Sequence, residues 1–321
     1  MSDTEFEIIR RYFTRQTPQR EDVIAGIGDD AALLRVPADR ELVVCMDTLV
    51  AGVHFPVSTT AAAIGYKALA VNLSDLAAMG ATPAWATLSV TLPDNDPAWL
   101  ENFSQAFFEL ADRYDIQLVG GDTTRGPLSV TVQAHGLVPG GSALRRQGAQ
   151  AGDRIYVTGT LGDAGLALRL GGQAENVLQQ RLDYPEPRIT AGQLLRDYAS
   201  AAIDISDGLL ADLGHMLAAD NPGASLNIDA LPRSAAFTAA TRQQAAFHEL
   251  PLSAGDDYEL CFTVPERDCA AMVAKLSSQS ITVTAIGAIE PEPGIRCYRA
   301  NGESYQPATE GYLHFGGTGN G

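Results

Sequence analysis

The residues of this chain best suited to chemistry are aspartates that stand beside glycine or a small polar residue, where strands or helices are expected to end. An aspartate at the end of a strand projects a carboxylate from the edge of a sheet, and neighbouring glycines let a phosphate group approach the backbone. Carboxylate oxygens are also ligands that Mg²⁺ prefers. The pattern occurs in five segments: Gly28-Asp29-Asp30, Met46-Asp47-Thr48, Asn72-Leu73-Ser74-Asp75, Gly120-Gly121-Asp122-Thr123 and Asp204-Ile205-Ser206-Asp207-Gly208.

The aspartate at position 75 can be interpreted either as a metal ligand or as a structural residue. Asp75 lies in an otherwise apolar helical segment, where a charge is costly unless it is paired or binds a metal. Asn72 precedes it by three residues and shares its face of the helix. A single aspartate is usually a helix cap or a turn residue. The residues alone therefore leave two interpretations in balance, a phosphate site with several Mg²⁺ ions or a set of caps and turns.

Several familiar motifs are absent from the chain. There is no G-x-x-x-x-G-K-[ST] segment, and neither of the two lysines, Lys67 and Lys275, follows a glycine, which excludes a P-loop. The H-R-D and D-F-G triplets of protein kinases and the G-x-S-x-G turn of α/β-hydrolases are also missing. Gly26-x-Gly28 lacks the remainder of a dinucleotide-binding fingerprint.

The composition is that of a globular protein, because 45% of the 321 residues are hydrophobic and 19% are charged. The net charge of −17 makes nucleic acid a poor partner. No apolar run is long enough to span a membrane, and no signal peptide is recognised. The four cysteines form no C-x-x-C pair, which predicts reduced thiols in the cytoplasm and no zinc site.

The periodicity of apolar residues predicts a mixed α/β chain in two halves. The glycine-rich stretch between residues 139 and 152 is the best boundary, so we expect domains at 1–150 and 151–321. A short amphipathic helix is expected around Phe6, Ile9 and Phe13. Strands are expected at 41–46, 85–92, 128–134, 154–157, 201–205, 258–264 and 281–285, and helices at 61–79, 97–114, 164–170, from about 208 onward, and at 266–277.

Eight segments, in order along nearly the whole chain, resemble the thiamine-monophosphate kinase family, which lies in the aminoimidazole ribonucleotide synthetase-like superfamily. Eight ordered motifs are far more specific than any one of them. The segments are GIGDDAALL from Gly26, MDTLVAGVHF from Met46, NLSDLAAMGATP from Asn72, LVGGDTTRG from Leu118, GDRIYVTG from Gly152, DISDGL from Asp204, GDDYELCF from Gly255 and GYLHF from Gly311.

The resemblance implies a fold and an activity. The N-terminal domain would bind ATP and Mg²⁺ and form a barrel with the sheet of a second copy in a homodimer, and the C-terminal α/β domain would complete the cleft. The enzyme would transfer the γ-phosphate of ATP directly to thiamine monophosphate, giving thiamine diphosphate without a phosphoenzyme. Several Mg²⁺ ions would serve as cofactors, with a monovalent cation as a further candidate. No general base is implied, because the acceptor phosphate is already anionic.

The family's roles are carried over at matching positions. The implied metal ligands are Asp30, Met46, Asp47, Asp75, Asp122, Asp204 and Asp207. The implied ATP contacts are Gly121, Asp122, Arg146 and Ser206, and the implied substrate contacts are His54, Asp256 and Phe315.

Three of these residues have simpler interpretations when the sequence is taken alone. Arg146 reads as a surface arginine, His54 as a structural histidine, and Phe315 as a tail aromatic that packs on the core. Within the resemblance, Arg146 would hold ATP phosphates, His54 would touch the acceptor phosphate, and Phe315 would stack on the cationic thiazolium ring.

The chain departs from the family pattern in two places. Cys45 and Met46 stand where the family usually has small hydroxyl residues, so a metal would have to use the main-chain carbonyl there. Asp256 stands where the family usually has glutamate, so the carboxylate is one methylene shorter.

Two other functions stay open. One is a superfamily enzyme with another acceptor, such as aminoimidazole ribonucleotide synthetase, and the other is a non-catalytic scaffold that binds nucleotide or metal.

Overall fold

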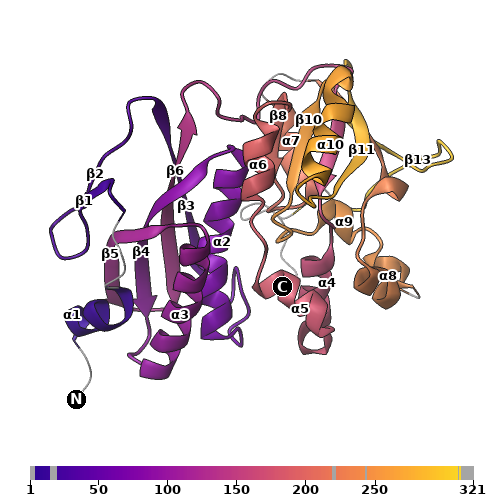
Figure 1. Cartoon of the computed structure of the whole chain (residues 1–321). Helices are drawn as coiled ribbons and strands as arrows, with labels where there is room; N and C mark the ends of the chain where they lie inside the picture. The colour runs from indigo at the N-terminus through magenta and orange to yellow at the C-terminus, as the bar shows by residue number, and fades with distance from the viewer. Residues whose placement is uncertain (1–3, 15–19, 219–221, 243, 310, 312–321) are drawn as a thin grey trace. The chain divides into compact units, whose positions relative to one another are not determined.

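The computed structural model describes residues 4–14, 20–218, 222–242, 244–309 and 311. The chain divides into two compact units (Figure 1). The first unit contains the chain up to Leu76 together with Ala81–Ala143, and the second contains Ala77–Gly80 and the chain from Leu144 onward. Each unit has its own sheet, and the fold is of the mixed α/β class.

The first unit is built on a four-stranded sheet in the order β3-β6-β4-β5. Its strands are β3 (Arg40–Val50), β4 (Thr82–Leu92), β5 (Gln117–Arg125) and β6 (Ser129–Pro139). Neighbouring strands are antiparallel except β4 and β5, which are parallel. In β6, buried and half-buried residues alternate strictly, which is typical of a strand with only one face against the core.

Two helices, α2 (Ala61–Ala78) and α3 (Pro97–Arg113), cover one face of this sheet (Figure 1). Asp96 caps α3 by accepting a hydrogen bond from the Ala98 N–H, and Pro97 occupies the first turn. Phe103 and Phe107 are fully buried, and a Cβ at Gly65 of α2 would lie 2.2 Å from the Phe103 carbonyl oxygen. The two helices therefore pack at close range.

The N-terminal segment forms α1 (Glu5–Ile8) and a π-helical turn over Ile9–Phe13, so the expected helix is present with a different buried face. Ile8, Tyr12 and Phe13 are buried, whereas Phe6 is 78% exposed. Of the three residues whose spacing predicted an amphipathic helix, Phe13 is therefore on the buried face and Phe6 is not, because the π-turn changes the helical period along this segment.

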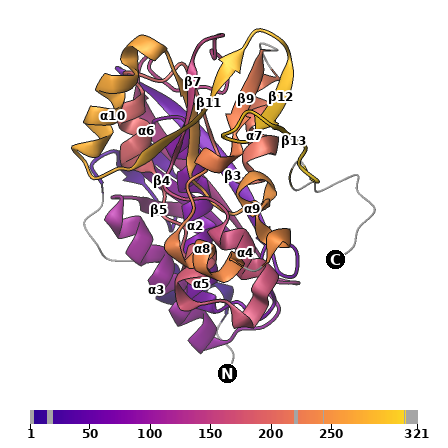
Figure 2. The same ribbon diagram turned by 90° about the vertical axis from the view of Figure 1, so that its right-hand side faces the viewer.

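The second unit contains a seven-stranded sheet in the order β13-β12-β9-β11-β7-β10-β8. Figure 2 shows β9, β11 and β12 with α7 beside them. The strands are β7 (Arg154–Thr158), β8 (Ala201–Asp204), β9 (Gly223–Asn227), β10 (Leu260–Val264), β11 (Val283–Glu290), β12 (Gly294–Tyr298) and β13 (Ser304–Tyr305). The helices are α4 (Asp163–Leu170), α5 (Asn176–Asp183), α6 (Ile189–Leu195), α7 (Leu209–Leu217), α8 (Ala235–Thr241), α9 (Leu250–Ser253) and α10 (Cys269–Ser277).

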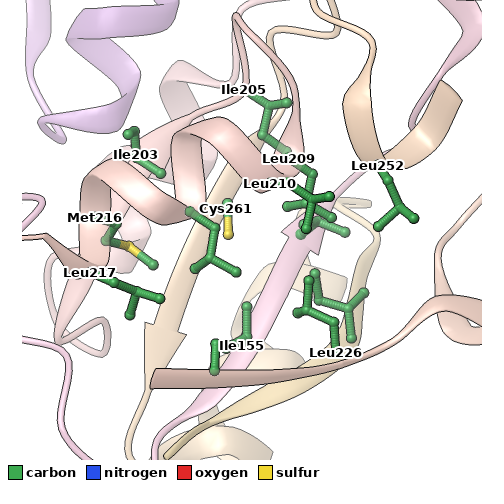
Figure 3. Close-up of a cluster of buried hydrophobic side chains, with 14 of the residues drawn as sticks. Ile155, Ile203, Ile205, Leu209, Leu210, Met216, Leu217, Leu226, Leu252 and Cys261 are labelled. Carbon is green, nitrogen blue, oxygen red and sulfur yellow. The ribbon is translucent and has the colours of Figure 1, made fainter. Parts of the chain in front are cut away.

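The core of the second unit lies between this sheet and α7 (Figure 3). Ile155, Ile203 and Cys261 come from three neighbouring strands, and Leu209 and Met216 meet them from α7. All five side chains are essentially inaccessible to solvent. This packing fixes the first turn of α7, and with it the loop that precedes the helix.

Among the described residues, no helix combines the length and the apolar character that a membrane crossing requires. Each of the four cysteines carries a thiol rather than a disulfide.

Candidate functional site

In the first unit, Asp47 and Asp122 lie on the two edge strands, β3 and β5. The strand register places Asp47 opposite Val132 of β6, Val132 opposite Leu88 of β4, and Leu88 opposite Gly121. Asp122 therefore lies one row further along, three strand spacings away, or about 14 Å. Alternation along the strands also directs these carboxylates to opposite faces of the sheet. The sheet of one chain does not bring Asp47 and Asp122 together.

The face on which Asp47 lies is the one covered by α2. Cys45, two residues earlier on β3, directs its Sγ to the Asn72 carbonyl oxygen of α2 at 3.3 Å. Met46 points to the opposite face and is 61% exposed. A role for Met46 therefore depends on its backbone carbonyl, since its side chain is on the other side of the sheet from Asp47.

Helix α2 is buried at every residue from 63 to 78 except Asp75, which is half-buried. Asn72, three residues earlier, is completely buried and donates from Nδ2 to the Ala68 carbonyl oxygen at 3.1 Å. Its Oδ1 finds no hydrogen-bond partner within the described part of the chain. Burying an amide oxygen without a hydrogen-bond partner costs free energy, so Asn72 Oδ1 is an acceptor that a ligand or water could satisfy.

His54 follows β3, and its ring is oriented by the end of that strand. Its Nδ1 accepts a hydrogen bond from the Val50 N–H at 3.0 Å, and the backbone N–H of His54 donates to the Val50 carbonyl oxygen at 3.0 Å. A neutral ring whose Nδ1 is an acceptor carries its proton on Nε2. Nε2–H is the donor that an anionic oxygen needs.

The Gly28-Asp29-Asp30 segment forms the loop of a small hairpin made by β1 (Val23–Ala25) and β2 (Leu33–Leu34), and Asp30 is exposed. Val23 packs with Trp85 and Val119. The hairpin is therefore anchored beside β5, the strand that also carries Asp122.

Gly121 in β5 tolerates no side chain. A Cβ at this position would lie 1.8 Å from the Leu88 carbonyl oxygen of the adjacent strand. The glycine allows β4 and β5 to pair directly beside Asp122, which lies opposite Ser89 of β4.

In the second unit, Asp204 ends β8, and Ser206 and Asp207 follow it in a loop. The backbone of this loop is hydrogen bonded to the loop that contains Asp256. The Asp256 N–H donates to the Ser206 carbonyl oxygen at 2.9 Å, and the Tyr258 N–H donates to that of Ile205 at 2.8 Å. A Cβ at Gly255 would lie 2.3 Å from the Ser206 oxygen, so only glycine permits this approach.

The second of these loops contains two residues in a backbone conformation that side chains disfavour. Asp256 has φ of 67° and Tyr258 has φ of 50°. Their side chains interact, because the Tyr258 hydroxyl donates to Asp256 Oδ1 at 3.1 Å. Strained non-glycine residues persist only where the surroundings fix them, and they are concentrated at functional sites.

Asp212, in the first turn of α7, holds the loop from the other side. Its Oδ2 accepts hydrogen bonds from the N–H groups of Ser206 at 2.9 Å, Asp207 at 3.0 Å and Gly208 at 3.2 Å. Burial, together with the nearby charge of Asp204, raises the pKa of Asp212 to about 7.

A buried charged network supports the base of the Asp256 loop. Glu259 is completely buried and accepts from Arg188 at 2.5 and 2.6 Å, from Arg181 at 2.7 Å and from Thr158 at 2.6 Å. Burial alone would raise the pKa of Glu259, but the hydrogen bond and charge of Arg188, with help from Arg181 and Thr158, lower it instead. Glu259 is therefore ionised and carries a negative charge.

Asp257 lies in the same interior, but its pKa is shifted in the opposite direction. Both of its oxygens accept from the Gly162 N–H at 2.9 Å. Burial raises the pKa of Asp257 well above its ordinary value and outweighs that hydrogen bond and the charge of Arg181. Two acidic residues that are two positions apart thus have opposite pKa shifts.

The remaining predicted contacts are on the same unit. Arg146 is exposed and follows Arg145, whose carbonyl oxygen accepts from the Ala202 N–H of β8, the strand that ends at Asp204. Gly311 lies against the Asp204–Gly208 loop, because a Cβ there would be 3.0 Å from the Asp207 carbonyl oxygen. Phe315 lies outside the described residues.

No group of three or more histidine, cysteine, aspartate or glutamate side chains in the described ranges is arranged to hold a metal by itself. Mg²⁺ differs from zinc in this respect, because it usually takes one or two carboxylates and completes its octahedron with water and substrate phosphates. Carboxylates distributed singly and in pairs are a suitable donor set for it.

Sequence reasoning assigned no role to Asp212, Asp257 or Glu259. The last two stand inside the GDDYELCF motif, so the motif itself was the available signal. Charged residues are rarely fully buried, and their partners lie up to 101 residues away in the chain.

Comparison with known proteins supports the fold of both units. The family model described as AIR synthase related protein, N-terminal domain, matches residues 28–138, and the model for the C-terminal domain matches residues 150–299. The chain therefore has the two-domain fold of the AIR synthase related class, as the resemblance implied.

Closer relatives define the family. The thiamine-monophosphate kinase of Escherichia coli K12 is 50% identical over 324 residues, which cover 98% of this chain and 99% of that protein. The crystal structure of thiamine-monophosphate kinase from Stenotrophomonas maltophilia K279a is 49% identical, covers 89% of this chain and 93% of its own, and has a TM-score of 0.84. AaThiL complexed with AMPPCP and TMP is 31% identical, covers 90% and 92%, and has a TM-score of 0.76. The chain belongs to the thiamine-monophosphate kinase family, and that prediction is confirmed.

Proposed function

We propose that the protein transfers the γ-phosphate of ATP to thiamine monophosphate and forms thiamine diphosphate. The observation that carries this proposal is the identity of 50% to a thiamine-monophosphate kinase over nearly the whole of both chains. The complex of AaThiL with AMPPCP and TMP supports ATP and thiamine monophosphate as the two ligands.

The proposed metal ligands are Asp30, Asp47, Asp75, Asp122, Asp204 and Asp207, with the Met46 carbonyl as a further one. Each unit would contribute carboxylates to this set of ligands. Mg²⁺ bound to these residues would neutralise the charge of two substrates that are both polyanions. The half-buried Asp75 and the exposed Asp30 and Asp122 fit this assignment, because their carboxylates reach the protein surface.

The chain's own residues would bind and orient the reactants. His54 would donate from Nε2 to the acceptor phosphate, since its Nδ1 is engaged by the Val50 N–H. Asp256, oriented by Tyr258, and Phe315 would hold the cationic thiamine end. Gly121, Asp122, Arg146 and Ser206 would contact ATP. Positioning of this kind is the main contribution a protein makes to direct in-line phosphoryl transfer.

We also propose a homodimer formed through the sheet of the first unit. Leu42, Val44 and Met46 stand on the β3 face that α2 and α3 leave open, and they are 44%, 49% and 61% exposed. An apolar row of this kind on a strand is suited to burial against a partner. A barrel closed by two sheets also places each edge strand beside an edge of the second copy, which gives Asp47 and Asp122 neighbours that one chain lacks.

Incubation with MgATP and thiamine monophosphate, followed by chromatography for thiamine diphosphate, tests the function. Formation of thiamine diphosphate with one ADP per turnover is the expected result. Release of ADP only with the substrate of aminoimidazole ribonucleotide synthetase would replace this function with the alternative, and metal binding without turnover would indicate a scaffold. A phosphorylated protein residue in a quenched single turnover would contradict direct transfer.

The oligomeric state has a test of its own. Sedimentation of Val44→Asp should show a monomer where the native chain shows a dimer, because a charge is then forced into the apolar face. The four thiols support a reducing compartment, the cytoplasm.

A further inference from the structure

The loop between β8 and α7 presents three successive backbone N–H groups that converge on one point, the Oδ2 atom of Asp212. Successive N–H groups in such a concave arrangement make an anion-binding nest, and many nucleotide-binding proteins place a phosphate in it. Here the protein's own carboxylate occupies the nest. The N–H groups of Ser206, Asp207 and Gly208 are thus already engaged when a ligand arrives.

The opposite edge of the same loop is also engaged. The carbonyl oxygens of Ile205 and Ser206 accept from the N–H groups of Tyr258 and Asp256. Ser206 is therefore held through both its N–H and its carbonyl group. What the loop has left to offer a ligand is side chains, chiefly the carboxylates of Asp204 and Asp207 and the hydroxyl of Ser206.

We propose that Asp212 is a positioning residue, which fills the nest of the Asp204–Gly208 loop so that this loop receives phosphates through cations on its carboxylates rather than through its backbone N–H groups. The inference deepens the proposed function and rests on the assignment of Asp204 and Asp207 as metal ligands. Asp212 itself would touch neither substrate nor metal. It acts through the shape of the loop.

A simpler role for Asp212 is stabilisation of α7 alone, and a matched residue separates the two roles. Asp153 is another buried carboxylate of the same unit, 6% exposed, whose Oδ2 accepts from the Gln150 N–H at 3.0 Å and from the Ser200 hydroxyl. No ligand role is assigned to Asp153. Asp153→Asn should therefore reproduce the loss of a buried loop-holding carboxylate without any change in ligand binding.

The experiment compares Asp212→Asn and Asp153→Asn with the native chain in two measurements that need no turnover. One is hydrogen exchange of the amides of residues 206–208. The other is calorimetric binding of a non-hydrolysable ATP analogue as a function of Mg²⁺ concentration. In Asp212→Asn we expect the three amides to exchange at least about tenfold faster, because a neutral amide oxygen is a weaker acceptor. We expect the affinity for the Mg²⁺–analogue complex to fall about 10–100-fold, the usual loss when a residue that orients metal ligands is changed.

The control should melt at a similarly lowered temperature with both readouts at native values. Native affinity for the Mg²⁺–analogue complex in Asp212→Asn, despite faster exchange, would overturn the proposal, as would an equal loss of affinity in both variants. If Asp212→Asn does not fold, Asp212→Glu keeps the charge and displaces the oxygen, and it should show smaller changes of the same sign. Neither measurement uses thiamine monophosphate. If the native chain fails to phosphorylate that acceptor, the proposed function is wrong, but the two measurements on Asp212→Asn are unaffected.

Discussion

The two units hold their candidate carboxylates in different ways. In the first unit, Asp30, Asp47, Asp75 and Asp122 come from a hairpin loop, two edge strands and a helix, and Asp30 and Asp122 are exposed. In the second unit, Asp204 ends β8, and Asp207 and Asp256 lie on two loops that are hydrogen bonded to each other. Asp212 and Glu259 support these loops from the interior.

This difference indicates a division between function and stability. Removal of an exposed carboxylate in the first unit should lower activity strongly with little effect on folding. In the second unit, the residues that shape the site are also part of the core, so changes there should affect both properties.

The largest effect is expected for Asp122→Asn in the first unit. The catalytic efficiency kcat/KM should fall about 10²–10³-fold, the usual loss when one electrostatic contact to the transferring group is removed. The free energy of unfolding should change by no more than about 0.5 kcal/mol, because Asp122 is exposed. Steady-state kinetics and urea unfolding measure the two quantities. Asp94→Asn, an exposed aspartate of the same unit, should leave both unchanged, and a large loss of stability in Asp122→Asn would contradict the contrast.

A large effect on stability is expected for Glu259→Gln in the second unit. Breaking a fully buried ion pair costs about 3–5 kcal/mol. Arg181 and Arg188 keep 23% and 25% side-chain exposure, so we expect the smaller loss of about 2–3 kcal/mol in chemical denaturation. Glu266→Gln is the matched control, because its pair with Arg154 is exposed and should contribute no more than about 0.5 kcal/mol. Equal losses in the two variants would show that burial does not decide the strength of these pairs.

The opposite pKa shifts of Glu259 and Asp257 predict opposite dependences on pH. The pKa of Glu259 is lowered from 4.5, so its stabilisation is present above that pH and disappears as the pH falls through its folded-state pKa. The pKa of Asp257 is raised from 3.8, so its contribution is lost as the pH rises. In denaturation between about pH 3 and 8, the deficit of Glu259→Gln should shrink toward acid, and Asp257→Asn should gain stability relative to the native chain toward neutral pH. Parallel curves for the two variants would refute these assignments.

The smallest effect is expected for Tyr258→Phe, which removes the hydroxyl that orients Asp256. One hydrogen bond contributes about 0.5–1.5 kcal/mol, so the KM for thiamine monophosphate should rise about two- to tenfold while the KM for ATP stays constant. Tyr305→Phe removes a comparable hydrogen bond to Glu249 and should change neither KM. Equal increases in both KM values for Tyr258→Phe would exclude a selective role at the thiamine end.

The parts of the fold that the sequence predicts well are those set by local pattern. The alternation from Leu128 to Ala134 predicts β6, and the spacing of Trp99, Phe103 and Phe107 predicts α3. In contrast, β9 and β12 were not expected, because each is short and gains its stability by pairing with the other, about 70 residues away.

The candidate site shows the same limit. Motifs identify Asp204, Asp207 and Asp256, but the pairing of their loops is set by the β8–β10 ladder, which joins Asp204 to Leu260. The burial of Glu259 could not be predicted either, because its partners Arg181 and Arg188 are 78 and 71 residues away in the sequence. The positions of Asp47 and Asp122 on opposite faces of a sheet also follow only from strand register.

The two-sided support of the Asp204–Gly208 loop has a consequence for how the protein acquires its shape during synthesis. Asp212 emerges from the ribosome immediately after the loop and can engage its N–H groups within a local turn. The carbonyl groups of Ile205 and Ser206 gain their hydrogen bonds only when the N–H groups of Tyr258 and Asp256, about 50 residues later, have been synthesised. Long-range contacts form more slowly than local ones. The nascent chain therefore carries a half-assembled loop until the strand after it, β10, has been made.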